Sequence, residues 1–352
     1  MGGCRKVILQ NMNQIEVLLL SQNDLQSLAL SHEDTLGSVE QALVEHSHAT
    51  YEMHPKIGVH PTGTDPGNFI HAMPAYLRQL GACGLKWVAG FARNSERGLP
   101  NITGVQICND IETGVPLAIM DCAYLTGLRT AAVSTSIARR CARADASVLA
   151  LCGCGFQGGL HLEFLVQTLP NIREVRCYDV RPGAAAALAE RARSAGYLRG
   201  KIEACDSPEA CIRDADVIST CTNGDDEIIR KEWFKPGAFG VGIEGGCAYK
   251  AEALHQADKF IVDDIPLAEY FQKISIGRKN DHGEDNPEFP GGIPPVYATI
   301  GDIIAGKKAG RESAEERIIA IPIGMAICDI ALGHLVYQRA SARGVGQKFR
   351  LA

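Results

Sequence analysis

Three glycines, Gly153, Gly155 and Gly158, have the G-x-G-x-x-G spacing of a turn that can bind a pyrophosphate. The first glycine makes a tight turn, the second lets the backbone approach the phosphates, and the third lets a helix pack closely against a strand. The helix offers its free N–H groups to the anion. Asp179 ends the next apolar run, where a carboxylate can accept hydrogen bonds from a ribose 2′-OH. These residues predict a dinucleotide-binding turn.

The residues at the end of the second apolar run, Asp179 and Arg181, also indicate which dinucleotide binds. A carboxylate repels a 2′-phosphate, so Asp179 favours NAD over NADP. Arg181 lies two residues later, and its guanidinium can pair with a phosphate, which weakens the preference. We predict NAD as the cofactor, with NADP as the less favoured alternative, and include Arg181 among the cofactor-binding residues.

The elements that must hold this turn follow from the surrounding pattern. Residues 148–151 are an apolar run that predicts a buried strand, and residues 159–169 predict an amphipathic helix. Strands and helices then alternate, as a doubly wound parallel sheet requires. The further strands expected are residues 174–178, a strand near 202, 217–220, 239–243 and 259–262, and the further helices are residues 183–195 and a short helix from 208.

Polar residues follow two of these expected strands. Thr220 and Thr222 close the strand at 217–220, and Glu244 follows the strand at 239–243. In open parallel sheets, ligands bind at the carboxyl ends of the strands. We therefore expect these side chains to face the dinucleotide crevice, where Glu244 is a candidate proton donor.

Three cationic residues precede the glycine turn. Lys86 lies in an apolar predicted strand, where an ammonium must either pair or lose its charge. Arg129 falls in the first turn of a helix that we expect to begin at Thr126, which is the unfavourable end of the helix dipole for a cation. Lys56 is a third candidate. An external anion, such as a substrate carboxylate, explains these placements, and pairing with a local acidic residue is the alternative.

The first part of the chain predicts an α+β domain with a sheet of its own. Its short apolar runs are separated by Gly, Pro, Asn and Asp turns. We expect helices after Ser21 and Ser31, a long loop or lid at residues 277–295, and a largely apolar final helix at about 325–340. The expected strands are residues 17–20, 56–59, 69–73, 85–89, 105–108 and 116–120.

The composition is that of an ordinary globular protein. The chain has 352 residues, 46% hydrophobic and 22% charged, with a net charge of −6. It has no basic stripe, so nucleic acid and anionic membranes are not expected partners. The N-terminal segment has no secretory pattern, and the 13 cysteines are scattered through apolar segments. We expect a cytoplasmic protein and, without ligand spacing among these cysteines, no metal site.

Over residues 15–345 the sequence resembles the ornithine cyclodeaminase/mu-crystallin family. The resemblance rests on six motifs, which are G-L-K-W-V at 84–88, G-L-P at 98–100, N-D with T-G-x-P at 109–116, L-T-x-x-R-T-A-A at 125–132, G-x-G-x-Q-x-x-x-H at 153–161 and G-x-A-x-x-D at 324–329. The family implies a homodimer. It also implies a substrate-binding and dimerisation domain from residues 1–127 plus 320–352, and a Rossmann dinucleotide-binding domain from residues 128–319.

The resemblance also implies roles for individual residues. Lys86 matches a lysine that binds the substrate carboxylate, and Arg129 matches an arginine at the junction of cofactor and substrate. Lys56 stands where many members have arginine, so it can contact a carboxylate without bidentate geometry. The positions that match cofactor contacts are Asn101, Gly153, Gly155, Phe156, Gln157, Gly158, Asp179, Thr220, Thr222 and Ile243.

One departure from the family bears on the reaction. Ornithine cyclodeaminases carry an aspartate after the Gly-Gly that follows the fifth Rossmann strand, where it handles the distal amine during ring closure. The corresponding position here is Gly246, and Glu244 could substitute only if the loop is displaced. Pro322 likewise replaces a common serine. Hydride transfer stays possible, because it belongs to the nicotinamide.

We therefore predict an NAD(H)-dependent oxidoreductase that acts on the C–N bond of an α-amino or α-imino acid, as an imine reductase or amino-acid dehydrogenase. Lys86, Arg129 and Lys56 would hold the carboxylate, and Lys86, Glu244 or water would give the proton to nitrogen. One alternative is an ornithine cyclodeaminase that uses NAD catalytically. Another is a non-catalytic, mu-crystallin-like protein that binds a nucleotide and a small ligand, against which the retention of Lys86 and Arg129 argues.

Overall fold

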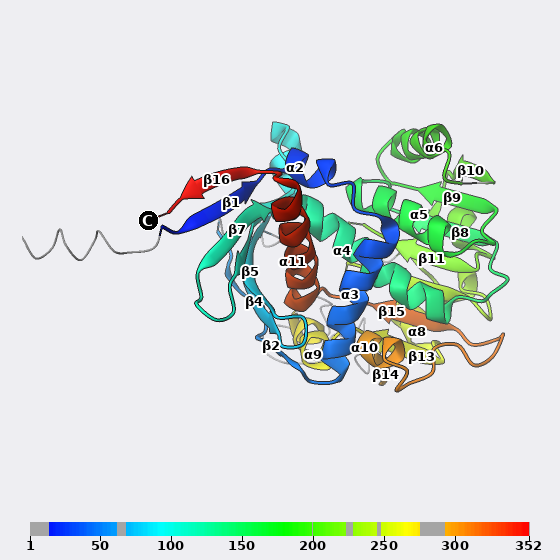
Figure 1. Cartoon of the computed structure of the whole chain (residues 1–352). Coiled ribbons are helices and arrows are strands. Elements are labelled where there is room, and N and C mark those ends of the chain that lie inside the picture. The colour runs from blue at the N-terminus through cyan, green and yellow to red at the C-terminus, as the bar shows by residue number, and fades with distance from the viewer. Residues whose placement is uncertain are drawn as a thin grey trace, which may run out of the picture. The chain divides into compact units, whose positions relative to one another are not determined.

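The computed structural model describes residues 14–61, 68–198, 200–222, 228–244, 248–274 and 293–351 (Figure 1). The chain divides into two compact units, each with its own eight-stranded sheet. Unit 1 consists of residues 1–31, 50–126 and 329–352, and unit 2 consists of residues 32–49 and 127–328. One sheet is mixed and the other is parallel, which confirms the predicted α/β class with a Rossmann-type sheet.

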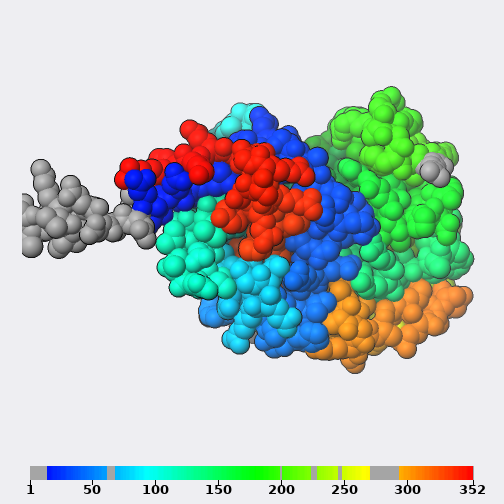
Figure 2. Space-filling view, viewed as in Figure 1, coloured from blue at the N-terminus to red at the C-terminus, as the bar shows by residue number. Residues whose placement is uncertain are grey.

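The sheet of unit 1 has the order β16-β1-β7-β6-β5-β4-β2, and β3 pairs with β4. The β1–β7 pair is parallel, and the other pairs between the described strands are antiparallel. The early strand β1 and the late strand β16 lie side by side (Figures 1 and 2). The elements are β1 (Glu16–Leu20), α2 (Gln22–Ser27), β2 (Tyr51–Met53), β3 (Ile57–Val59), β4 (Phe69–Leu77), β5 (Ala82–Gly90), η1 (Ala92–Arg97), β6 (Ile102–Asn109), β7 (Pro116–Asp121), α11 (Ala326–Arg343) and β16 (Gln347–Arg350).

Alternation along β5 gives this sheet one buried face and one exposed face. Lys86 is buried in β5, whereas its neighbour Trp87 is exposed. On the buried face, the register aligns Met73, Lys86 and Gln106 across β4, β5 and β6. The main-chain carbonyl of Asp329, in α11, accepts a hydrogen bond of 2.8 Å from Gln106 Nε2. Helix α11 therefore packs on this face.

In unit 2 the sheet order is β10-β9-β8-β11-β12-β15-β13-β14, and the described pairs are all parallel. The chain moves outward from β8 to β10 and then returns to β11 beside β8, so the strand order reverses between β8 and β11. Such a switch point opens a crevice at the carboxyl ends of the strands. The strands are β8 (Val148–Cys152), β9 (Glu174–Tyr178), β10 (Lys201–Ala204), β11 (Val217–Thr220), β12 (Phe239–Gly242), β13 (Lys259–Val262), β14 (Val296–Thr299) and β15 (Ile318–Ile321).

The helices of unit 2 include one from the first fifty residues of the chain. Ser47 Oγ, in α3, donates a hydrogen bond of 2.7 Å to Asp302 Oδ1 in α10, so α3 packs within unit 2 although the sequence analysis grouped it with the first domain. The helical segments are α3 (His32–Ser47), α4 (Cys122–Cys141), α5 (Phe156–Thr168), α6 (Ala184–Ala195), α7 (Pro208–Ile212), η2 (Lys231–Trp233), α8 (Ala251–His255), α9 (Ile265–Ile274) and α10 (Ile300–Ile304).

The start of α4 corrects the sequence analysis. We expected this helix to begin at Thr126, but it begins at Cys122. The cause is Asp121, whose Oδ1 accepts a hydrogen bond of 2.9 Å from the N–H of Tyr124 and so caps the helix at its N-terminus. Arg129 consequently lies two turns into the helix rather than in its first turn. Arg129 therefore does not lie at the positive end of the helix dipole, contrary to our prediction.

The predicted strands are otherwise confirmed, whereas several short strands were missed. β14 and β15 are four residues each, and β15 is inserted between β12 and β13 rather than following in chain order. A short apolar run that is followed by Pro322 carries no periodicity by which it can be recognised. The loop or lid expected at residues 277–295 lies almost wholly outside the described residues.

Candidate functional site

The glycine turn of unit 2 has no room for side chains at two of its three positions. Gly153 has a φ of +94°, and a Cβ there would lie 2.3 Å from the carbonyl oxygen of Cys221. A Cβ at Gly158 would lie 1.9 Å from the carbonyl oxygen of Gly153, so this glycine lets α5 pack against the turn. A Cβ at Gly155 would meet no atom closer than Arg181 Nη2, at 3.7 Å. The space at Gly155 is therefore left open by the protein, as the approach of a pyrophosphate requires.

Asp179 ties the end of β9 to the same turn. Its Oδ2 accepts a hydrogen bond of 2.7 Å from the N–H of Cys154, and Arg181 donates to both of its oxygens from Nε at 3.0 Å and Nη2 at 2.9 Å. Burial alone would raise the pKa of Asp179, but the hydrogen bonds from Arg181 and Cys154 lower it below its ordinary value. Asp179 is thus ionised, and Arg181 neutralises it.

Two buried polar atoms beside the carboxyl ends of β8 and β11 could form hydrogen bonds with a bound ligand. Gln157 Oε1, at the start of α5, and Thr222 Oγ1, after β11, are buried and have no hydrogen-bond partner among the described residues. Buried polar atoms are nearly always hydrogen-bonded, so these two fit an external donor such as a nucleotide. Two other predicted cofactor-binding residues are also described. The Phe156 side chain, next to Gln157 in the chain, is largely exposed. The N–H of Ile243 donates a hydrogen bond of 3.2 Å to the carbonyl of Thr220.

Glu244 points into the interior of unit 2 rather than into open solvent. Thr220 Oγ1 donates a hydrogen bond of 2.6 Å to Glu244 Oε1, and Oε2 is buried without a partner among the described residues. A Cβ at Gly242 would lie within 3.0 Å of Glu244, Thr220 and Tyr249, so this glycine makes the space for the carboxyl group. Burial raises the pKa of Glu244 to about 7.

Arg129 is buried in unit 2 against a glycine near the end of the chain. A Cβ at Gly324 would lie 2.8 Å from Arg129 Nη1, and Gly324 has a φ of +98°. Asp263 holds this turn, because its Oδ2 accepts hydrogen bonds from the N–H groups of Ile323 at 2.9 Å and Gly324 at 2.6 Å. The Gly324 backbone thus forms a close wall beside the guanidinium.

In unit 1, Lys86 is buried and forms an ion pair of 2.7 Å with Asp329. His71 lies on the same face of the sheet, and Phe69 stacks on its ring at a centroid distance of 4.3 Å. Burial lowers the pKa of His71 to about 4, and the positive charges of Lys56 and Lys86 add to the effect. Lys56 and Lys86 therefore place two cationic groups around a neutral histidine.

Two sequence-predicted residues have local structural partners. Asn101 Oδ1 accepts a hydrogen bond of 3.1 Å from the N–H of Ser95 and fastens η1, which gives it a local role in unit 1. His161, in the family motif of α5, is fully buried between Gln157 and Ser134. Since the Gln157 carbonyl can only accept, Nδ1 carries the proton and Nε2 accepts from Ser134. Burial lowers the pKa of His161 to about 4, as its structural role requires.

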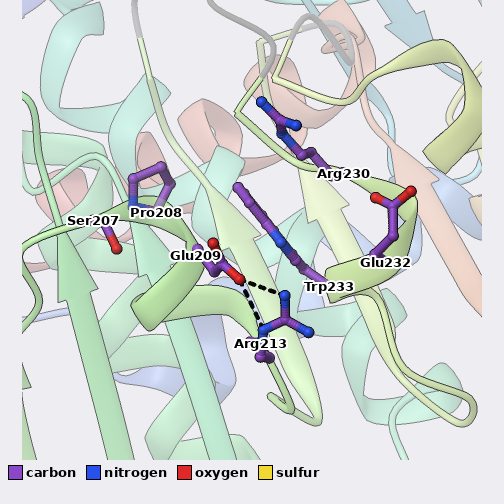
Figure 3. Close-up of a pocket in the computed structure, with 7 residues that line it drawn as sticks. All are labelled: Ser207, Pro208, Glu209, Arg213, Arg230, Glu232 and Trp233. Atoms are coloured by element: carbon purple, nitrogen blue, oxygen red, sulfur yellow. Dashed lines mark hydrogen bonds and ion pairs between the residues drawn. The ribbon is translucent and has the colours of Figure 1, made fainter.

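A surface pocket of unit 2 is separate from all of these residues. It has a volume of about 490 Å³ and lies between α7 and the η2 segment of unit 2 (Figure 3). Glu209 and Arg213 pair with each other across one side, and Arg230 lies 5.6 Å above the Trp233 ring on the other. None of the residues that line this pocket belongs to the glycine turn or to the strand ends beside it, so the pocket is not part of the dinucleotide site.

Other classes of site have no support among the described residues. No group of histidine, cysteine and acidic side chains in that part of the chain could hold a metal ion. No helix within it is both long and apolar enough to cross a membrane. Asp329 belongs to one of the six family motifs, but sequence reasoning does not predict that it pairs with Lys86. The feature of the sequence that could have identified Asp329 is its position as an acidic residue in the apolar first half of the helix.

Unit 2, with its parallel sheet, glycine turn and closing aspartate, is a Rossmann-type dinucleotide-binding fold, and unit 1 adds a mixed sheet with a buried lysine. The chain belongs to the ornithine cyclodeaminase/mu-crystallin family, whose profile matches residues 15–344.

Three relatives are similar over nearly the whole chain. Alanine dehydrogenase from Archaeoglobus fulgidus is 34% identical over 340 residues, which cover 96% of this chain and 99% of that one. The solved structure of an archaeal alanine dehydrogenase dimer with bound NAD is 33% identical, with a TM-score of 0.82, and covers 96% and 100%. The Δ1-pyrroline-2-carboxylate reductase of Thermococcus litoralis, solved with NADH and L-proline, is 25% identical, with a TM-score of 0.81, and covers 94% and 99%.

Proposed function

We propose that this protein is an NAD(H)-dependent oxidoreductase that acts on the C–N bond of an α-amino or α-imino acid. The observation that carries the proposal is that one chain combines the Asp179-closed glycine turn with a buried ammonium group at Lys86. The relatives support it, since they include an amino-acid dehydrogenase and an imino-acid reductase. The open space at Gly155 and the unpartnered atoms of Gln157 and Thr222 fit a dinucleotide.

In the proposed reaction, the cationic residues bind the substrate carboxylate. Lys86 supplies a buried ammonium, Lys56 a second positive charge, and Arg129 a guanidinium that can bind a carboxylate or a phosphate in bidentate fashion. A bound nicotinamide supplies or accepts hydride at C4. Burial of Lys86 and Arg129 excludes water, which strengthens their attraction for the carboxylate.

We assign the proton for the substrate nitrogen to Glu244. Because burial raises its pKa to about 7, Glu244 is protonated at pH 6 and ionised at pH 9. We expect the kcat for reduction to fall as pH rises through about 7, and Glu244→Gln to lower kcat by about a hundredfold and to abolish this pH dependence. The exposed Glu252→Gln in α8 is the control, and a Glu244→Gln enzyme with the wild-type pH profile would refute the assignment.

Asp179 is proposed to select NAD. We expect Asp179→Asn to lower the ratio of NADH to NADPH affinity by about a hundredfold. The substitution removes the carboxylate that would accept hydrogen bonds from the ribose, and it weakens the two hydrogen bonds with Arg181, which frees Arg181 for a 2′-phosphate. Asparagine keeps an acceptor for the N–H of Cys154, so the turn is retained. Fluorescence titrations with both cofactors measure the ratio, and Arg181→Ala should weaken NADPH binding to the Asp179→Asn variant. An unchanged ratio would rule out this role for Asp179.

The proposed activity is tested by NADH oxidation at 340 nm with pyruvate plus ammonia, other α-keto acids plus amines, and cyclic imino acids. NADH consumption with any of these supports the reductase. A parallel assay measures ammonia released from ornithine with NAD. Ammonia release without net NADH formation would establish a cyclodeaminase instead. Binding of NADH without either activity would leave the mu-crystallin-like alternative.

We also propose a homodimer. The outer face of the unit 1 sheet is apolar along one row of cross-strand partners, in which Ile57, Trp87 and Val105 are exposed. An exposed apolar face of this kind is typical of a subunit interface. We propose a cytoplasmic location as well, which the free cysteines of the described residues support because thiols persist in a reducing compartment.

A further inference from the structure

Lys86 belongs to a network of three buried side chains within unit 1. Its Nζ donates a hydrogen bond of 2.7 Å to Asp329 Oδ1, and the two residues are 1% and 0% exposed. Gln106 is the cross-strand partner of Lys86 in β6 and is also 0% exposed. Gln106 Nε2 donates to the main-chain carbonyl of Asp329 at 2.8 Å. One residue of α11 therefore accepts hydrogen bonds from two neighbouring strands.

Helix α11 is shaped for this contact. Gly333 lies one turn after Asp329, and a Cβ at this position would lie 1.8 Å from Gln106 Nε2. Any side chain at residue 333 would therefore push Gln106 away from the Asp329 carbonyl. On the other side, a Cβ at Gly84 would lie 3.2 Å from Ile330 Cδ1. These two glycines let the helix approach β5 and β6 closely enough for Asp329 to reach Lys86.

The charges around Lys86 explain why an acidic partner is needed. A buried ammonium without a counter-charge loses its proton, because low dielectric penalises the charged form. His71, the titratable group of β4 on this face, is neutral because burial lowers its pKa to about 4, and Lys56 is positive. Asp329 supplies a negative charge at hydrogen-bonding distance.

We propose that Asp329, held in place by Gln106, is the positioning residue that keeps Lys86 charged and directs it toward the substrate carboxylate. The inference rests on the proposed function, from which it takes the role of Lys86. Asp329 acts through Lys86 and does not touch the substrate. An ammonium has three donors, so Lys86 can keep its bond to Asp329 while it donates to a carboxylate.

The test is the pH dependence of KM for the Asp329→Asn variant. Pyruvate with ammonia and Δ1-pyrroline-2-carboxylate are the substrates, and KM and kcat are measured from pH 6 to pH 9. We expect KM at pH 8 to rise at least tenfold, with a smaller change in kcat. We also expect KM to recover toward the wild-type value at pH 6, because solvent protons then restore the charge of Lys86. A residue that only stabilised the fold would not give this recovery.

A double-mutant cycle shows whether Asp329 acts through Lys86. Lys86→Met/Asp329→Asn replaces the buried ion pair by two uncharged side chains, so it avoids an unpaired buried charge and covers the case in which Asp329→Asn alone does not fold. We expect Asp329→Asn to cause no further loss of substrate binding in the Lys86→Met background. The control is Asp216→Asn, which breaks a 2.8 Å pair with Lys235 in unit 2 and should leave KM unchanged.

Two outcomes would overturn the inference. One is an Asp329→Asn enzyme whose KM has the wild-type pH dependence while Lys86→Met abolishes binding. The other is an Asp329→Asn effect that persists undiminished in the Lys86→Met background. By contrast, full turnover by Lys86→Met would show that the carboxylate site lies elsewhere. The proposed function itself would be refuted if the wild-type protein oxidised no NADH with any of the substrates, so failure of the two ideas can be told apart.

Discussion

Lys86→Met is expected to lower kcat/KM by about a thousandfold. This corresponds to about 4 kcal/mol, which is within the range for removing one partner of a buried, hydrogen-bonded charge pair. Methionine retains most of the apolar stem of the lysine side chain but removes the ammonium, so the loss reports mainly the charge. Its removal also leaves Asp329 buried without its ion-pair partner, which is expected to lower the free energy of unfolding as well.

Lys348→Met is the control for this variant. Lys348 lies in β16 of the same unit, but its side chain is 74% exposed and pairs with Glu16 at 3.0 Å. An exposed pair of this kind contributes little, so kcat/KM and the free energy of unfolding should both stay near the wild-type values. Steady-state kinetics and urea unfolding at pH 7.5 check both variants. Turnover by Lys86→Met within tenfold of the wild type would show that the carboxylate site lies elsewhere.

Gly158→Ala is expected to weaken NADH binding by about a hundredfold. The new Cβ would lie 1.9 Å from the carbonyl oxygen of Gly153, a contact that neither backbone can relieve by rotating a side chain. The helix and the turn must therefore separate by about 1 Å or more, which displaces the N–H groups that face the pyrophosphate. A fall in the free energy of unfolding should accompany the loss of affinity.

The next residue provides a matched control. A Cβ at Gly159 would meet only Leu188 Cδ1, at 3.8 Å, which is ordinary van der Waals contact. Gly159→Ala should therefore leave NADH affinity unchanged and stabilise α5 by about 0.5–1 kcal/mol, because alanine loses less backbone entropy in a helix. Fluorescence quenching measures the affinity, and thermal unfolding measures stability. Equal effects of the two substitutions would mean that the close packing of Gly158 is not what the cofactor requires.

The sequence predicted the parts of the fold that depend on local pattern. The glycine spacing, the apolar runs of β8 and β9, and the acid at Asp179 lie within about thirty residues, and the structure brings them together as expected. The order of the sheet is less local. β15 enters between β12 and β13 from a later part of the chain, and four apolar residues carry no information about which neighbours they will have.

The site was predicted less completely than the fold, for the same reason. Lys86 stood out because a charge in an apolar strand needs a partner, but the partner, Asp329, is 243 residues away. Only the docking of α11 on the sheet selects that acid from the other acidic residues of the chain. Arg129 was placed in the wrong turn of its helix because Asp121 was not recognised as the cap. Glu244 can be buried because Gly242 has no side chain to fill the same space, and no rule of residue spacing predicts this relation.

The pairing of β1 with β16 has a consequence for how the protein is made. β1 pairs on one edge with β7 and on the other with β16. The Lys348 side chain donates a hydrogen bond to Glu16 across β16 and β1, although the two residues are 332 positions apart in the chain. During synthesis, the N–H and C=O groups on the outer edge of β1 cannot pair with β16 until residues 347–350 have left the ribosome. In the described sheet the edge strand is β16, which is exposed and carries Lys348 and Arg350, whereas chains that stop short of β16 would present the apolar strand β1 as the edge and are expected to aggregate.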